Sequence, residues 1–257
     1  MQKMKKVESA ESTQLITSDT LFDGELYCRQ FKNGYRFSVD AILIAQFYRP
    51  SKGETILDLG AGSGVIGLIM MYRWKQFIAS LRALELQPEL CELCNQNYRE
   101  NGVDDTCCCH QGDVSQILQI FRPESFSLIV CNPPFYRPES GRKSLARQAK
   151  IARHQITADI AGFAKGAAAV LKNGGSAVFI YPAEQLVELI AALSGVNLEI
   201  KELQFVYSYP NAQVNAKLVL VRCTKNGGRG LWVKEPLYIY QEKNGDYSEQ
   251  MKQFFTC

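Results

Sequence analysis

The chain has 257 residues and is 46% hydrophobic, with 29 lysine and arginine residues against 26 aspartate and glutamate residues. The hydrophobic fraction is sufficient for a sizeable core, and the length suits one large α/β domain. A net charge of only +3 excludes a strongly basic protein, so any attraction to a polyanion must come from a local patch.

The amino-terminal stretch MQKMKKVESAESTQ has no apolar run behind its lysines, so it lacks the pattern of a signal peptide. Apolar stretches such as AILIA are far too short to span a membrane. We therefore expect a soluble, cytoplasmic protein without a membrane anchor, whose residues 1–14 form a mobile tail.

The nine cysteines are an odd number in a chain without an export signal, which favours reduced thiols over a disulfide framework. Cys91 and Cys94 lie one turn apart in a helical pattern. Cys107, Cys108 and Cys109 are adjacent in a strand pattern, where side chains alternate between two faces and cannot converge on one ion. We therefore expect no metal site.

Residues 15–50 predict a small extension before the main fold. Asp23 and Gly24 separate two β-prone runs in TLFDGELYCRQF, which is a hairpin signal. In the following NGYRFSVDAILIAQFYRP, Ser38 or Asp40 is placed to cap a helix that Pro50 ends.

Residues 51–257 alternate between apolar runs and amphipathic helical patterns, which predicts a mostly parallel sheet with helices on both faces. NLEIKELQFVYSYP and NAKLVLVRCTK are two β-prone runs joined by a short polar link and predict an antiparallel pair. The remaining tail contains two short strand candidates and a helical turn. No linker separates a second domain, so we expect one domain overall.

The stretch ILDLGAGSGVIGL places a glycine-rich loop between a strand and a helix. The loop residues expected to approach a nucleotide-like cofactor are Gly60, Ala61, Gly62 and Gly64. GSGVIG also fits G-x-G-x-x-G, so a nicotinamide or flavin cofactor is an alternative. Asp58 favours S-adenosylmethionine, because a carboxylate beside the loop repels a pyrophosphate but attracts the sulfonium and ammonium of that molecule.

Two further acids follow the next strand patterns. Glu85 ends the strand in RALELQP, where it is placed to accept both ribose hydroxyls, and Asp113 in HQGD is placed to accept from an adenine amino group. LDLGAGSG, LELQP, GD and NPPF resemble, in order and spacing, the seven-stranded S-adenosylmethionine-dependent methyltransferases. This resemblance implies a Rossmann-like fold with one antiparallel strand near a sheet edge.

The motif CNPPFYRP follows the apolar run FSLIV and predicts a catalytic turn. The Asn132 side-chain oxygen and the Pro133 carbonyl can each accept one N–H of an exocyclic amine. Pro133 and Pro134 fix φ, so the turn is rigid. Phe135 would stack on the target base, an interaction of roughly 1–3 kcal/mol. The same motif serves enzymes acting on adenine, guanine N2, cytosine N4 or the glutamine amide of proteins.

The segment GRKSLARQAKIARH, directly after this turn, contains no acid and predicts an RNA contact. Its basic residues are Arg142, Lys143, Arg147, Lys150 and Arg153. Together with ARHQIT and YSYPNAQVNAKLVLV, these motifs resemble the bacterial tRNA(Val) adenine-N6 methyltransferases. The resemblance implies that Phe37, Ser38 and Asp40 lie on the cofactor side, and it leaves the role of His154 open.

The residues leave four hypotheses. The first is a tRNA adenine-N6 methyltransferase that uses S-adenosylmethionine. The second is a ribosomal RNA guanine-N2 or protein-glutamine methyltransferase with the same chemistry. A dinucleotide-dependent oxidoreductase and a non-catalytic RNA-binding fold are the others, and the acids around the loop and the intact Asn132 argue against both.

Overall fold

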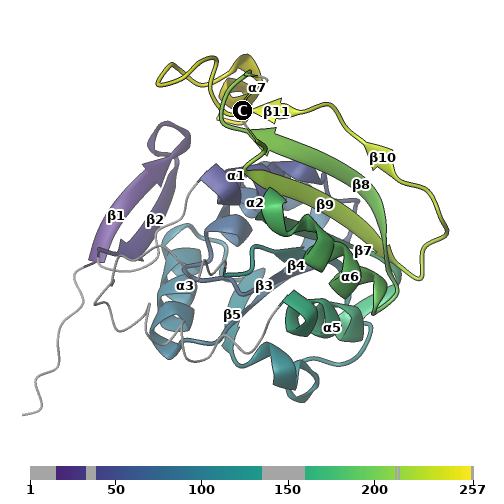
Figure 1. Cartoon of the computed structure of the whole chain (residues 1–257). Helices are drawn as coiled ribbons and strands as arrows, with labels where there is room; N and C mark the ends of the chain where they lie inside the picture. Colours follow the sequence, from purple (N-terminus) through teal and green to yellow (C-terminus); the bar gives the residue numbers. More distant parts are fainter. Residues whose placement is uncertain (1–15, 33–38, 135–159, 212, 214, 256–257) are drawn as a thin grey trace, which may run out of the picture.

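The computed structural model describes residues 16–32, 39–134, 160–211, 213 and 215–255. A sheet with helices on both faces dominates these residues (Figure 1). Its strands are β3 (Glu54–Leu59), β4 (Ile78–Glu85), β5 (Cys107–Gln111), β6 (Phe126–Cys131), β7 (Leu171–Pro182), β8 (Leu198–Tyr207), β9 (Leu218–Lys225), β10 (Trp232–Val233) and β11 (Leu237–Tyr238).

The sheet has the order β10-β8-β9-β7-β6-β3-β4-β5, with β11 also paired to β8. Strands β3 to β7 are parallel to one another, whereas β9 runs antiparallel to both β7 and β8. The predicted fold class is therefore confirmed, including the antiparallel strand near one edge. The two-residue strands β10 and β11 extend the seven expected strands, because the tail runs alongside the outer edge of β8.

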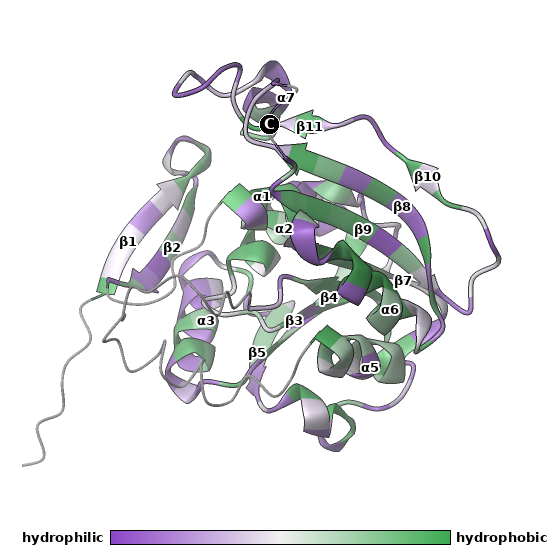
Figure 2. Cartoon of the chain, in the orientation of Figure 1, coloured by the Kyte–Doolittle hydropathy of each residue, from purple (hydrophilic) through white to green (hydrophobic). Residues whose placement is uncertain are grey.

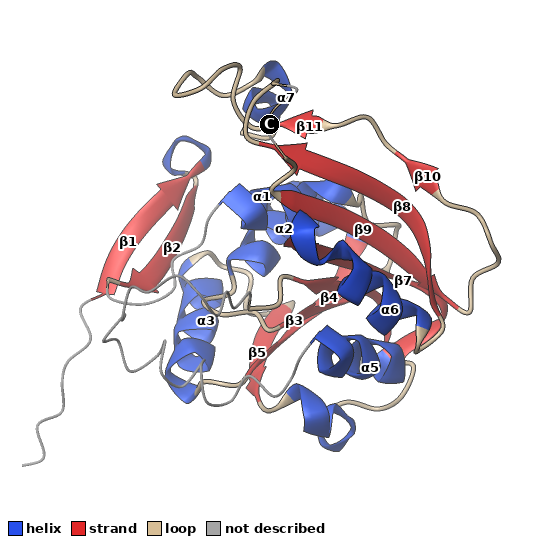
Figure 3. Ribbon diagram, in the orientation of Figure 1, coloured by secondary structure: helices blue, strands red, loops and turns tan. Residues whose placement is uncertain are grey.

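Helices cover the two faces of the sheet in separate groups (Figure 3). The α-helices are α1 (Val39–Phe47), α2 (Val65–Trp74), α3 (Pro88–Glu100), α5 (Ile160–Val170), α6 (Leu186–Ser194) and α7 (Glu249–Gln253). Residues of α1, α2 and α3 share one hydrophobic core with alternate residues of the strands. Residues of α5 and α6 share the other core with the intervening strand residues and with the 3₁₀ helix η3 (Val114–Gln119). This period-2 division explains why the strands are nearly continuous apolar runs.

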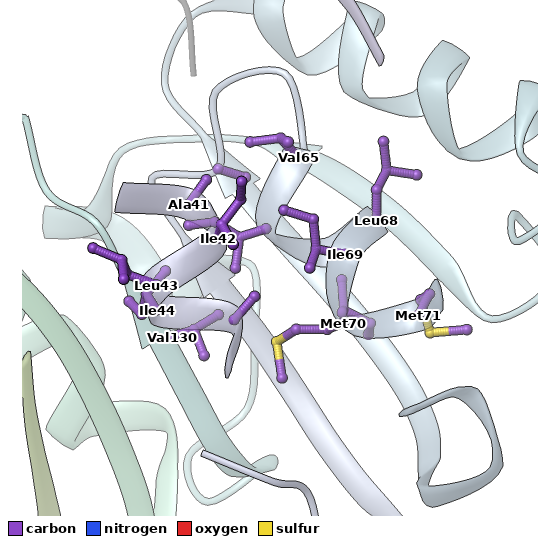
Figure 4. Packing of buried hydrophobic residues seen from close by; sticks show 14 of the residues in the cluster. Ala41, Ile42, Leu43, Ile44, Val65, Leu68, Ile69, Met70, Met71 and Val130 are labelled. Atoms are coloured by element: carbon purple, nitrogen blue, oxygen red, sulfur yellow. The ribbon is translucent and has the colours of Figure 1, made fainter. Parts of the chain in front are cut away.

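Packing on the first face is dense where α1 meets α2. Figure 4 shows Ile42 of α1, Ile69 and Met70 of α2, and Val130 of β6 gathered in this layer. All four side chains are buried. Hydrophobic colour also runs along β8 and β9, interrupted by hydrophilic positions (Figure 2). None of the helices in the described ranges has the length and apolar character needed to cross a bilayer.

The predicted amino-terminal hairpin is present and stands beside α3 (Figure 1). Strands β1 (Ile16–Leu21) and β2 (Leu26–Phe31) pair antiparallel around the 3₁₀ turn η1 (Phe22–Gly24). Asp23 and Gly24 both adopt positive φ, at 54° and 91°, as this tight turn requires. Phe22 stacks on Tyr72 of α2 with ring centroids 4.5 Å apart, which anchors the turn to the main fold.

Candidate active site

The candidate site lies at the carboxyl ends of four neighbouring strands. β3 lies between β6 and β4, and β5 follows β4, so the strand order reverses between β3 and β6. Ligands of open α/β sheets bind at such a reversal, because the loops on either side diverge there. The residues that follow these strands are Gly60 to Gly64, Glu85, Asp113 and Asn132. The structure therefore brings the sequence-predicted loop, acids and amide to one edge.

The glycine loop has the left-handed backbone that its sequence predicts. Gly60, Gly62 and Gly64 have φ of 81°, 58° and 82°. The N–H groups of Gly60 and Ala61 both donate to the carbonyl of Leu84, at 2.9 and 3.1 Å. The loop is thus held against β4, directly before the start of α2.

Glu85 is a fixed carboxylate at the end of β4. Its Oε2 accepts the N–H of Gly62 at 2.8 Å and its Oε1 accepts that of Gln87 at 2.9 Å. Burial raises the pKa of Glu85, and these two N–H groups lower it in part. Each carboxylate oxygen has two lone pairs, so each keeps acceptor capacity for a ribose hydroxyl.

Asp58 is a buried carboxylate on β3 without a compensating charge. Its exposure is 0%, and neither oxygen is hydrogen-bonded within the described part of the chain. Burial raises its pKa to about 7; the N–H of Gly67, although it makes no well-formed hydrogen bond, lowers the pKa in part, and the charge of Glu85 raises it. A carboxylate that has lost its water and found no partner suits a cationic ligand and disfavours a phosphate.

The other predicted cofactor residues have more ordinary surroundings. Asp113 caps η3, and its Oδ1 accepts the N–H of Ser115 at 2.8 Å. Asp40 lies inside the first turn of α1, so it is not the residue that caps this helix. Phe37 and Ser38 lie outside the described residues.

Asn132 supplies the second unpaired polar atom of the edge. Its Oδ1 is buried and accepts no hydrogen bond from the described residues. An unsatisfied buried acceptor costs about 1–3 kcal/mol, so this oxygen calls for a donor from outside the described residues. Pro133 is buried and Pro134 is exposed beside it. Phe135 lies outside the described residues.

The predicted RNA-contact residues Arg142, Lys143, Arg147, Lys150 and Arg153 lie outside the described residues, as does His154. In the described part of the chain, no group of three or more His, Cys, Asp or Glu side chains is arranged to hold a metal ion. Cys107 and Cys109 are buried, whereas Cys108 is half-buried on the opposite face and lies 3.3 Å from His110 Nε2.

Sequence reasoning missed two residues of α3 that lie beneath the glycine loop. Asn97 is fully buried, and its Nδ2 donates to the carbonyl of Ser63 at 2.8 Å. A Cβ at Gly67 would lie 2.5 Å from the hydroxyl of Tyr98, so Gly67 permits helix packing. The helical spacing of Cys94 and Tyr98 indicates a buried face, but nothing local indicates a contact between Asn97 and a distant loop.

Comparison with known proteins is consistent with this geometry. Residues 38–193 match the family model "Methyltransferase small domain". A tRNA1(Val) (adenine(37)-N6)-methyltransferase of Shewanella sp. strain MR-4 is 27% identical over 219 residues, which are 85% of this chain and 89% of the relative. The protein of that name from Vibrio campbellii is 30% identical over 152 residues, which cover 59% of this chain and 60% of the relative.

A solved structure described as a predicted O-methyltransferase from Agrobacterium tumefaciens has the same fold. The TM-score is 0.66 at 19% identity, and the match covers 84% of this chain and 94% of that one. At this identity the likeness concerns the fold, whereas the family match spans most of the chain and contains the glycine loop, Glu85 and Asn132. The chain belongs to the methyltransferase small domain family.

Proposed function

We propose that this protein transfers a methyl group from S-adenosylmethionine to the N6 amine of an adenine in tRNA, at the position next to the anticodon of a valine tRNA. The observation that carries the proposal is the unpaired Oδ1 of Asn132, buried at the end of β6 beside the glycine loop. An amide oxygen in this position needs an N–H donor from outside the described residues, and an exocyclic amine provides one.

The residues at the carboxyl edge fit S-adenosylmethionine. The buried carboxylate of Asp58, which has no hydrogen bond from the described residues, suits a positive charge, and Glu85 retains acceptor capacity for the ribose. Asp113 is placed one strand further out, for the adenine amino group. The bound cofactor supplies an electrophilic methyl group on a sulfonium.

The turn after β6 orients the amine for attack. The lone pair of an exocyclic amine is delocalised into its ring, so the amine is a poor nucleophile whose orientation limits the rate. Asn132 Oδ1 and the Pro133 carbonyl accept its two N–H groups, which holds the nitrogen toward the methyl group. Nitrogen becomes strongly acidic once it is methylated, so acceptors suffice and no strong base is required.

Support for a tRNA substrate comes from the names of the relatives and from the one-sign basic segment between Arg142 and Arg153. A tRNA substrate also implies a cytoplasmic location. The second candidate is methylation of guanine N2 or of a protein glutamine amide, because the acceptors at Asn132 and Pro133 suit any planar amine. An oxidoreductase is disfavoured by the unpaired carboxylate of Asp58 next to the loop.

Labelled S-adenosylmethionine and total tRNA from a strain lacking the enzyme test the proposal directly. After incubation and nucleoside analysis, the label is expected in N6-methyladenosine of a valine tRNA. Recovery of the label in N2-methylguanosine, or in protein when ribosomal fractions are added, would contradict the adenine assignment and support the second candidate.

A further inference from the structure

The amino-terminal hairpin is docked onto α3 by asparagine side chains. Asn101, at the end of α3, accepts the N–H of Tyr27 at 3.0 Å and donates to its carbonyl at 2.7 Å. Asn97 accepts the N–H of Arg29 at 2.8 Å and donates to its carbonyl at 3.1 Å. Helix positions four apart are separated by about 6 Å and strand positions two apart by about 7 Å, so the two amides match the free edge of β2.

Asn97, unlike Asn101, also contacts the glycine loop. Its Nδ2 also donates to the carbonyl of Ser63 in the glycine loop, at 2.8 Å. Cys28 of β2, which is fully buried, also lies against Ser63, with its Sγ 3.9 Å from Ser63 Oγ. One buried amide therefore joins the hairpin edge and the cofactor loop.

The first part of the loop is held by hydrogen bonds from β4. The carbonyl of Leu84 binds the N–H groups of Gly60 and Ala61, and Glu85 binds that of Gly62. Ser63, the next residue, is held from the opposite side by Asn97. The loop conformation that meets the cofactor consequently depends on α3 and on the hairpin that α3 carries.

We propose that Asn97 is a positioning residue that couples the β1–β2 hairpin to cofactor binding. When the loop is ordered by the cofactor, the Ser63 carbonyl holds the Asn97 amide in the orientation that binds Arg29. When the hairpin is docked, the same amide is held ready for Ser63. Linkage makes this coupling reciprocal: the cofactor stabilises the hairpin, and the hairpin favours cofactor binding. The inference rests on the proposed function for the identity of the cofactor.

Helix α3 offers a matched control. Asn95 makes the same bidentate pair with a backbone, accepting the N–H of Cys109 at 2.8 Å and donating to its carbonyl at 3.0 Å. It binds β5 and not the hairpin. Asn101 binds the hairpin and not the loop. Alanine at Asn95, Asn97 and Asn101 thus removes the same chemistry from three different connections.

The experiment measures S-adenosylhomocysteine affinity by calorimetry and hydrogen exchange at the Tyr27 and Arg29 amides. Asn97→Ala should weaken binding about five- to tenfold, as expected for a lost buried hydrogen bond. It should also raise KM for S-adenosylmethionine more than KM for tRNA. Asn95→Ala should bind the ligand within about twofold of wild type. Asn101→Ala should speed exchange at Tyr27 and weaken binding less than Asn97→Ala does, because it loosens the hairpin but keeps the hydrogen bond from Asn97 to Ser63.

In the wild-type protein, S-adenosylhomocysteine should slow exchange at Tyr27 and Arg29. Asn97→Asp keeps the acceptor for the Arg29 N–H but cannot donate to the carbonyls of Ser63 and Arg29. It therefore removes the loop contact while keeping one hairpin contact, and it replaces the alanine variant if that variant does not fold. The coupling is overturned if Asn97→Asp binds S-adenosylhomocysteine with unchanged affinity. It is also overturned if the ligand leaves hydrogen exchange at Tyr27 and Arg29 of the wild-type protein unchanged. Failure of the wild-type protein to bind S-adenosylhomocysteine overturns the proposed function and the coupling together, whereas wild-type binding with unaffected variants overturns the coupling alone.

Discussion

At the scale of single residues, the edge of the sheet is defined by two unsatisfied buried groups. Asp58 and Asn132 lie at the ends of neighbouring strands, and neither the carboxylate of the first nor the amide oxygen of the second has a hydrogen-bond partner among the described residues. Folded proteins leave few such atoms without a partner, because each costs free energy. We interpret the pair as acceptors for the two kinds of donor in methyl transfer, a cationic cofactor and a planar amine.

Asn132→Ala should remove methyl transfer while leaving the cofactor bound. The side chain orients the amine and does not belong to the glycine loop, so loss of orientation should lower kcat by about 10²-fold or more. Single-turnover methylation and S-adenosylhomocysteine calorimetry measure the two effects separately. Loss of both activities in a folded variant would assign the turn a structural role.

Asp58 predicts a pH dependence of stability in the ligand-free protein. Its pKa is raised from 3.8 to about 7, so its contribution to stability is complete below the lower value and is lost as pH rises through the upper one. Asp58→Asn has no ionisable carboxyl group at this position, so it does not lose this stability as pH rises. The free energy of unfolding of the variant, relative to wild type, should therefore increase from about pH 5 to about pH 8.

Urea titrations at several pH values check the sign of this effect, and a difference that does not change with pH would contradict it.

The ionised carboxylate of Asp58 is the form that attracts an ammonium group. Affinity of the wild-type protein for S-adenosylhomocysteine should accordingly tighten as pH rises through about 7, with a flatter dependence in Asp58→Asn.

At the scale of elements, the strand–loop–helix unit from β3 to α2 is constrained by packing as well as by its ligand. Gly64 begins α2 with a left-handed φ and lies against Cys94 and Tyr98 of α3. Gly62 also has a left-handed φ, but a Cβ added there would meet no atom within 4 Å beyond its chain neighbours. The two glycines therefore separate the cost of conformation from the cost of crowding.

Gly64→Ala should destabilise the protein more than Gly62→Ala. Both substitutions carry the left-handed penalty of about 1–2 kcal/mol. A methyl group at Gly64 would also overlap the Cys94 sulfur, which adds about 1–3 kcal/mol of overpacking. Urea unfolding of the two variants measures the difference in the free energy of unfolding. Equal destabilisation would show that α3 shifts to accommodate the methyl group at no cost in free energy.

At the scale of the whole molecule, the described fold places the amino ends and the carboxyl ends of the parallel strands on opposite edges of one sheet (Figure 1). The carboxyl edge collects the glycine loop, the acids and Asn132, and the basic segment follows Asn132 in the sequence. We expect the tRNA to approach here, because the amine acceptors lie at this edge and the basic segment follows them closely in the sequence.

Replacing Arg142 and Lys143 by alanine should weaken tRNA binding and reduce its salt dependence. Loss of two phosphate contacts lowers the slope of log affinity against log salt by roughly 1.4–1.8. Replacing the exposed Lys52 and Lys75, which lie near the amino ends of β3 and β4, is the control that should leave the slope unchanged. Equal slopes in both double variants would remove the basic segment from the RNA site.

The sequence by itself determined the alternation of strands and helices, the hairpin at Asp23 and Gly24, and the positions of the glycine loop and of Asn132. These features follow from short-range periodicity and turn chemistry, which neighbouring residues express locally. Only the tertiary structure decided that β6 pairs with β3, that Asp58 is buried without a well-formed hydrogen bond from the described residues, and that Asn97 joins Arg29 to Ser63. The physical reason is that burial and hydrogen-bond pairing are set by residues far apart in the chain, and no local pattern specifies which of them meet.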